Sequence, residues 1–195
     1  RALNARGRNP KLTPQEQKCR LCKKHKESMH MFFQCESTRP LWRACINFVV
    51  DRGAPTPFDA RNALVLGLWD NSQLGPQFAR AFLRHAFEKF YHDFSNVALK
   101  NTHFIWELTF RDALLSLRDA TLRYANKLKR LHHTRNFTSR KNVAPKEAYA
   151  KFEMLIDIEY PTGDSTLHPD FQKAIDNAIE AANQRLNSNN DRRRH

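Results

Sequence analysis

Glycine and long apolar runs are both scarce in this sequence. Only 5 of its 195 residues are glycine, and no glycine-rich stretch of the kind that cradles nucleotide phosphates is present. No apolar run approaches the roughly 18 residues that a membrane-spanning helix needs, so we expect no membrane partner. The 4 cysteines are too few for a disulfide-stapled secreted protein of this length. These absences favour a reducing compartment and argue against nucleotide-dependent catalysis.

Acidic residues are outnumbered: 33 Lys and Arg stand against 20 Asp and Glu, which gives a net charge of +13. The positive charge is concentrated in two blocks, 1–43 and 118–146, on either side of a nearly neutral middle, and 147–180 is acidic. Dense basic blocks are typical of a protein that follows a phosphate backbone, although a solvated basic surface is the alternative. We therefore expect a nucleic-acid partner, RNA in particular.

The most specific feature that the sequence does contain is a Cys-x2-Cys-x7-His-x4-Cys array, made of Cys19, Cys22, His30 and Cys35. Thiolates bind Zn²⁺ well, and two cysteines separated by two residues can reach one ion from a tight turn. Four protein ligands leave no open position, so the spacing predicts a closed, structural Zn²⁺ site. His25 is an alternative to His30 as a ligand, and Cys45 is interpreted as a buried apolar residue.

The array resembles the C-terminal zinc-binding (CCHC) segment of non-LTR (LINE-type) retrotransposon reverse transcriptases. In that family the paired cysteines are followed by an acidic residue, by His and two Phe before the last Cys, and by a Trp that opens a helix. Glu27, Phe32, Phe33 and Trp42 stand at these places here. The likeness covers residues 19–43 and extends more loosely to about 130. No Tyr/Phe-x-Asp-Asp polymerase motif occurs, so the resemblance implies a nucleic-acid-binding module, domesticated in one interpretation, that performs no chemistry.

Apolar periodicity predicts an all-α fold behind this zinc knuckle. The first helix is expected over Leu41–Val50, with Ser37 or Thr38 as its N-cap. Two long helices, expected over 73–99 and 103–131, would form an antiparallel hairpin. Two further helices are expected, from Pro145 to Ile156 and from Pro169 to Leu186, with an acidic loop over 157–170 between them.

We therefore divide the chain into five parts: a basic arm (1–18), the CCHC zinc knuckle (19–43), a helical domain (44–142), C-terminal helices (143–187) and a basic tail (188–195). The arm and the tail lack apolar periodicity, so both are expected to be disordered unless a polyanion orders them.

The basic residues expected to contact nucleic acid lie in the arm, around the array and at the end of the second long helix. They are Arg6, Arg8, Lys11, Lys18, Arg20, Lys23, Lys24, Lys26, Arg123, Lys127, Lys129, Arg130, Arg135, Arg140 and Lys141. Their contacts would be to phosphates and would position the RNA without reading its sequence.

No catalytic residue set accompanies these features, so we expect no enzyme. Some LINE relatives carry a nuclease with a Pro-Asp pair, which Pro169-Asp170 matches, but no downstream lysine completes the set. The neighbouring residues read as helical, whereas such a nuclease needs a sheet to direct carboxylates at Mg²⁺. The adjacent His132 and His133 would point apart on a helix, so we expect no second metal site there.

These observations predict a non-catalytic RNA-binding structural component of a ribonucleoprotein, with neighbouring proteins as further partners. A mitochondrial ribosomal protein is one form of this, with a nuclear location as the alternative. The chain starts at Arg1, which agrees with a processed product or with a fragment of a LINE-type reverse transcriptase. A third alternative is a zinc-stabilised protein–protein adaptor that docks through its acidic segment 147–180.

Overall fold

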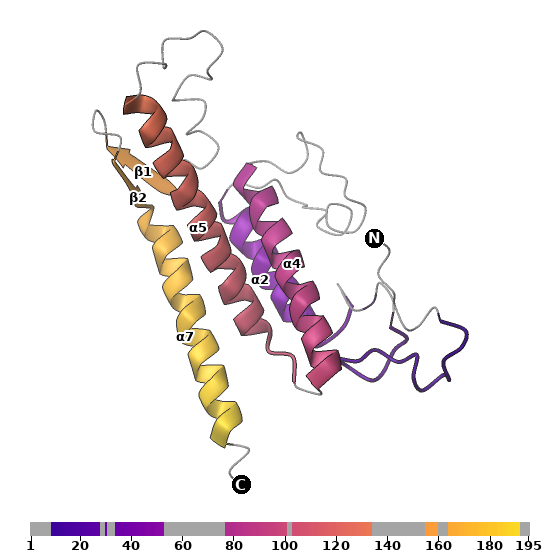
Figure 1. The fold of residues 1–195 in the computed structure, drawn as a ribbon. Helices are drawn as coiled ribbons and strands as arrows, with labels where there is room; N and C mark the ends of the chain where they lie inside the picture. Colours follow the sequence, from indigo (N-terminus) through magenta and orange to yellow (C-terminus); the bar gives the residue numbers. More distant parts are fainter. Residues whose placement is uncertain are drawn as a thin grey trace.

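The computed structural model of the chain describes residues 9–27, 30, 34–52, 77–100, 103–133, 155–159 and 164–191. Its elements in these ranges are α2 (Arg39–Val50), α4 (Gln77–Lys100), α5 (Trp106–His133), β1 (Ile156–Glu159), β2 (Asp164–Leu167) and α7 (Pro169–Asp191). The predicted all-α class is confirmed, since one small hairpin is the only sheet among the described residues and a cysteine-rich segment precedes the helices (Figure 1).

The long helices pack side by side in alternating directions. α4 and α5 form the predicted antiparallel hairpin, and α7 runs antiparallel to α5 on its other side (Figure 1). α2 lies against both α4 and α5. The metal-binding segment lies at the end of the bundle where α4 finishes and α5 begins.

The apolar stripe of α4 forms the centre of the core. Phe78, Phe82, Ala86, Phe90 and Phe94 recur every four residues and are all buried. This spacing places them on one helical face, because residues four apart lie one above the other. Core packing, rather than base stacking, therefore accounts for the phenylalanines of this helix.

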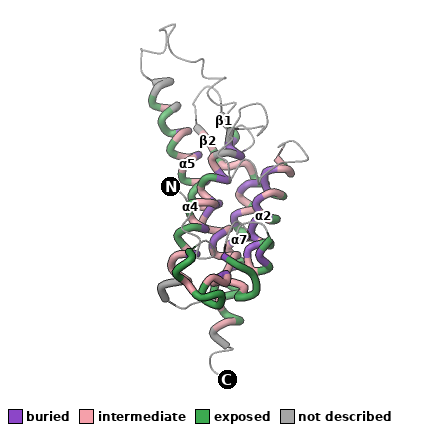
Figure 2. Tube along the Cα trace, turned by 90° about the vertical axis from the view of Figure 1, so that its right-hand side faces the viewer, coloured by how far each residue is buried: buried purple, intermediate pink, exposed green. Residues whose placement is uncertain are grey.

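α2 connects the metal-binding segment to the core. Thr38 is its N-cap residue and Pro40 lies in its first turn, as expected. Trp42 packs edge-on against Phe90, with ring centroids 5.5 Å apart. Phe48 lies 4.6 Å from the Phe82 ring centroid near the other end of the helix. Buried residues of α2, purple in Figure 2, thus contact α4 near both ends of α2.

The segment between α5 and α7 differs from the prediction. In place of a helix that ends at Ile156 and a loop over 157–170, β1 and β2 pair antiparallel, with Ile156 opposite Leu167 and Glu159 opposite Asp164. The run Ile-Asp-Ile-Glu alternates apolar and acidic residues, which is the period of a strand and not of a helix. Buried Leu155 and Ile156 join this hairpin to the bundle.

Both ends of the chain that were expected to be disordered contain residues with defined structure. In the arm, Thr13 and Glu16 form a capping box, because the Thr13 N–H donates to the Glu16 carboxylate (2.9 Å) and the Glu16 N–H donates to the Thr13 hydroxyl (3.3 Å). α7 continues to Asp191, beyond the predicted end at Leu186. The start of the arm, the segment 53–76, residues 145–154 of the helix expected from Pro145 and the last residues of the tail lie outside the described residues.

Candidate metal centre

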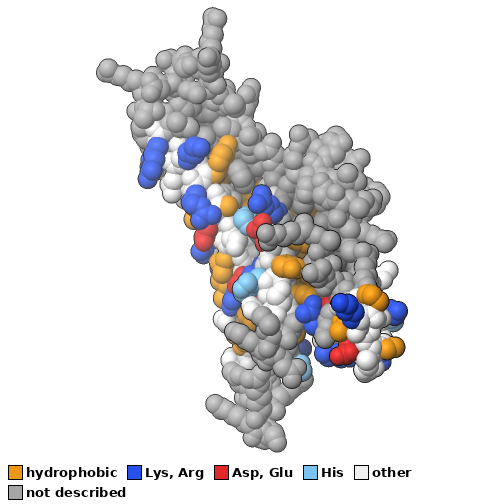
Figure 3. Space-filling model, turned by 45° about the vertical axis from the view of Figure 1, so that its right-hand side comes forward, with side chains coloured by type: hydrophobic (Ala, Val, Ile, Leu, Met, Phe, Trp, Pro, Cys, Tyr) orange, Lys and Arg blue, Asp and Glu red, His pale blue; other side chains and the backbone are white. Residues whose placement is uncertain are grey.

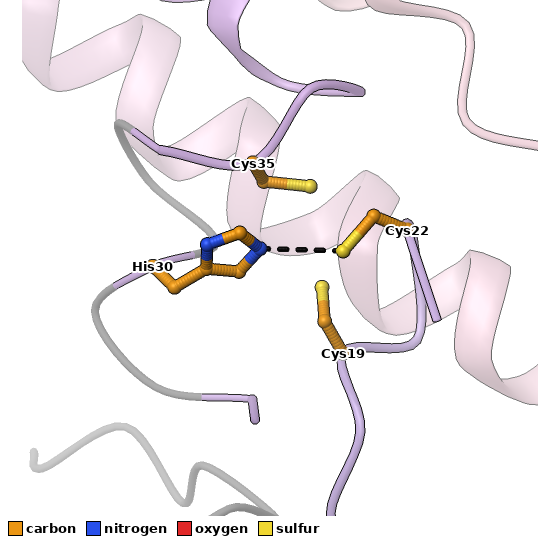
Figure 4. Close-up of side chains that lie close together, drawn as sticks. All are labelled: Cys19, Cys22, His30 and Cys35. Carbon is orange, nitrogen blue, oxygen red and sulfur yellow. Dashed lines mark hydrogen bonds between the residues drawn. The ribbon is translucent and has the colours of Figure 1, made fainter. Parts of the chain in front are cut away.

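The four residues of the predicted array come together in the folded chain. Each offers one ligand atom, and the four atoms of Cys19, Cys22, His30 and Cys35 all lie within 4.8 Å of one another (Figure 4). The Cys22 Sγ lies 3.2 Å from the His30 Nε2. The set can hold a metal ion, because a tetrahedral ion with metal–sulfur bonds of about 2.3 Å places its ligand atoms roughly 3.5–4 Å apart.

A tight turn presents Cys19 and Cys22. The Cys19 N–H donates to the His25 carbonyl (2.6 Å), and the Lys23 N–H donates to the Cys19 carbonyl (2.8 Å). Lys23 has a φ of 58°, which places it in the left-handed region and reverses the chain directly after the second cysteine. This turn leaves the backbone N–H groups of Leu21 and Cys22 free to donate to the Cys19 sulfur.

Cys35 is positioned by the start of α2. Its N–H donates to the His30 carbonyl (2.8 Å), so the third and fourth ligands are tied through the backbone. Its own carbonyl accepts the N–H of Thr38 (3.1 Å) and of Arg39 (2.8 Å). The last ligand therefore comes immediately before the first turn of the helix, and the helix fixes its direction.

Two of the sulfurs share a hydrogen bond. The bond from the Cys19 thiol lowers the pKa of Cys35 to about 5, against the opposing effect of burial. The same bond, together with burial, raises the pKa of Cys19 above its usual range. Four soft and borderline donors around one point are suited to a cation that replaces this shared proton, and three thiolates with one imidazole are a typical set for Zn²⁺.

A buried ion pair supports the centre from outside. Glu27 is fully buried, and both of its carboxylate oxygens accept from the Arg20 guanidinium at 2.7 Å. The Arg20 N–H also donates to Glu27 (3.2 Å). The guanidinium lies 4.4 Å from the centroid of the Phe94 ring of α4. This arrangement fastens the cysteine turn to the bundle.

The alternative ligands lie outside the cluster. The His25 ring packs on the His30 ring, with centroids 4.7 Å apart, so it lies beside the centre. Cys45 is fully buried on α2, and burial raises the pKa of its thiol, which agrees with its interpretation as an apolar core residue. The side chains of His132 and His133 lie outside the described part of the chain.

The predicted nucleic-acid contacts are only partly at the surface. Exposed members are Lys11, Lys23, Lys24, Lys26, Arg123, Lys127 and Arg130, whereas Lys18, Arg20 and Lys129 are partly buried. Figure 3 shows Lys and Arg side chains both over the metal-binding segment and over the upper part of α5. Arg6, Arg8, Arg135, Arg140 and Lys141 lie outside the described residues.

Arg20 is used inside the protein, which removes it from the expected RNA contacts. Its guanidinium is held by Glu27 and by Phe94. Lys24 forms an ion pair with Glu36 (2.8 Å) but stays exposed. The positive charge of Arg20 and Lys24 alone could not show that the first is held inside the protein and the second is exposed. The position of Glu27 between the second cysteine and the histidine is the available signal for an internal partner.

Comparisons with known protein families, with curated proteins and with solved structures give no match. Among the described helices, none combines the length and the apolar character that crossing a membrane requires. The fold and the centre therefore define a helical protein with a Cys₃His group that can hold a metal ion.

Proposed function

We propose that the Cys₃His centre holds a structural zinc ion and that the chain binds RNA without catalysis, as a structural component of a ribonucleoprotein. One observation carries the proposal. The turn that the centre closes presents Lys23, Lys24 and Lys26 to solvent, while Cys19 beside them is buried. An ion in the centre would fix this basic surface in one shape, which lowers the conformational cost of binding a polyanion.

The closed coordination supports a structural role for the ion. All four positions of a tetrahedral ion would be taken by protein, so no position remains for a water or a substrate. Two of the ligands, Cys19 and Cys35, belong to the same buried cluster as the helices. The metal would therefore stabilise the fold and the basic surface together.

A second candidate, based on the resemblance, is that the chain is the C-terminal nucleic-acid-binding part of a LINE-type reverse transcriptase. Two residues that carry the resemblance have defined structural roles: Glu27 holds Arg20, and Trp42 packs on Phe90. These contacts support the proposal, because they give the acidic residue and the tryptophan beside the array a structural role in this chain. We propose that such a module, without a polymerase, serves in a ribonucleoprotein such as the mitochondrial ribosome. A nuclear particle is the alternative.

RNA binding at two salt concentrations tests the proposal. The zinc-loaded chain should bind RNA, and the affinity should fall steeply between about 50 and 200 mM salt, because phosphate contacts release counterions. Replacing Lys23, Lys24 and Lys26 with Gln should weaken binding and flatten the salt dependence. Lys173→Gln, which changes one exposed lysine on α7, is a single-charge control. RNA binding that is absent, or unchanged in the triple variant, would overturn the proposal.

A further inference from the structure

A cavity of about 570 Å³ opens between α2, α5 and α7. Trp106, Glu107 and Phe110 of α5 line it, together with Asn47 of α2 and Asn177 of α7. None of its lining residues belongs to the metal centre. Its size is that of a ligand site, so it can hold a partner of its own, separate from RNA.

Acidic residues outnumber basic residues in the lining of the cavity, whereas the chain as a whole is positive. Three acidic residues, Asp51, Glu107 and Asp170, line the cavity against two basic ones, Arg52 and His168. The Arg52 guanidinium is already engaged, because it donates to the carbonyls of Phe48 (3.2 Å) and Asp170 (3.0 Å) and lies 4.1 Å from the Phe48 ring centroid. A negative cavity in a chain of net charge +13 favours a cation and repels phosphates.

Glu107 is the lining residue whose carboxylate is incompletely compensated. Its side chain is only 15% exposed, and its Oε2 is buried with no hydrogen-bond partner among the described residues. Arg185 forms a long ion pair with the other oxygen: its Nε lies 3.9 Å from the Glu107 Oε1, beyond hydrogen-bonding distance. A carboxylate in this position is costly unless a positive group compensates it.

The walls suit a side chain delivered by a polypeptide. Trp106 and Phe110 contribute aromatic rings to the lining, and a cation on an aliphatic stem is attracted to such rings. Ala44, Ala174 and Ala178 are small, so the groove between α2 and α7 has room for a backbone to approach. We propose that this cavity binds a lysine or arginine side chain of a protein partner, and that this protein contact is distinct from the RNA surface.

Nuclear magnetic resonance of the zinc-loaded chain tests this with a capped amino acid as the probe. Nα-acetyl-arginine amide should produce saturable shifts of the Trp106 indole N–H resonance. Nα-acetyl-citrulline amide has the same shape without the charge and should bind at least about tenfold more weakly, because it cannot neutralise Glu107. Equal shifts from both probes, or no saturable shift from arginine, would overturn the proposal.

Two variants locate the site. Glu107→Gln should remove the preference for arginine over citrulline, while Glu36→Gln, which changes an exposed carboxylate elsewhere, should keep it.

Ala181→Leu fills the mouth of the cavity from an exposed position and should abolish the shifts, whereas Asn183→Leu, outside the lining, should not. Arginine binding that survives both Glu107→Gln and Ala181→Leu would place the contact elsewhere and refute the inference. RNA affinity of Glu107→Gln should stay unchanged, which separates this site from the RNA surface.

Discussion

His30 and His25 are neighbouring rings with different positions relative to the cysteines. The His30 Nε2 points at the Cys22 Sγ (3.2 Å), whereas the His25 ring packs on the His30 ring from outside the cluster. Only the first can complete a tetrahedral set. The pair therefore offers a comparison in which the same side chain is removed at two adjoining places.

His30→Ala should lower zinc affinity by more than about 100-fold, beyond the roughly 10–100-fold that outer partners of a metal site typically contribute. His25→Ala should change it by a small factor, since only the packing of one ring on another is removed. Competition with a chromophoric chelator measures both affinities. The assignment of the fourth ligand would be wrong if His25→Ala abolished metal binding and His30→Ala retained it.

Glu27 shows how one buried carboxylate can hold the metal-binding segment on the bundle. It accepts three hydrogen bonds from Arg20, whose side chain is 23% exposed and lies over Phe94. Removing one member of such a pair leaves the other charge without compensation, which costs more than the pair itself contributes.

Glu27→Gln should therefore lower the free energy of unfolding by about 1–3 kcal/mol, the cost of a buried donor that loses its acceptor. Urea denaturation of the zinc-loaded protein measures it. Glu36→Gln is the matched control, because the Lys24–Glu36 pair is exposed and its removal should have no measurable effect. Equal stabilities of the two variants would show that the Arg20–Glu27 pair does not anchor the segment.

At the scale of elements, the long helices could be predicted from the sequence and the hairpin could not. The Phe stripe of α4 repeats over many turns, and such a repeat fixes both the helix and its buried face. β1 and β2 are four residues each. The alternation of apolar and acidic residues in β1 has too few repeats to decide against a helix end, and β2 (Asp-Ser-Thr-Leu) has no alternation.

The metal ligands were predictable for a related reason. The spacing of Cys19, Cys22, His30 and Cys35 is set by the geometry of one ion and is therefore local in the sequence. The contact of Arg20 with Phe94 was not predictable, because Phe94 lies on a distant helix and only the fold brings the two together. The cavity between α2, α5 and α7 likewise depends on how three separate helices pack.

The exposed basic face of α5 is the second surface that we propose for RNA. Arg123, Lys127 and Arg130 are spaced four and three residues apart and are all exposed, so they lie along one side of the helix. The side chains at all three positions are exposed to solvent. Substitution there should alter binding with little effect on the fold.

Replacing Arg123, Lys127 and Arg130 with Gln should weaken RNA binding. The slope of log affinity against log salt should fall by up to about 0.7–0.9 for each phosphate that the variant no longer neutralises. Circular dichroism should show unchanged helix, since Gln is a good helix former. Lys173→Gln on α7 serves as the single-charge control. A triple variant with the wild-type slope would exclude this face of α5 as an RNA surface.

At the scale of the whole molecule, the two proposed RNA surfaces lie at separate places along the bundle. The metal-binding segment packs at Phe94 of α4, and the neighbouring Asp93 accepts a hydrogen bond from Thr109 of α5 (2.8 Å). From Thr109, a helical rise of about 1.5 Å per residue places Arg123 and Arg130 about 20–30 Å further along α5. Both surfaces are visible on one side of the molecule (Figure 3).

One RNA should therefore reach both surfaces only when it spans at least about 20–30 Å, the helical rise between Thr109 and the basic face of α5. With RNA hairpins of increasing stem length, affinity should rise sharply at that span and then level off, because the second contact becomes intramolecular. In the Arg123, Lys127 and Arg130 triple variant the rise should disappear, while short stems bind as they do to the unsubstituted chain. Fluorescence anisotropy over the length series measures this. A smooth increase that the triple variant shares would mean that the two basic surfaces bind RNA independently and that the bundle does not set their spacing.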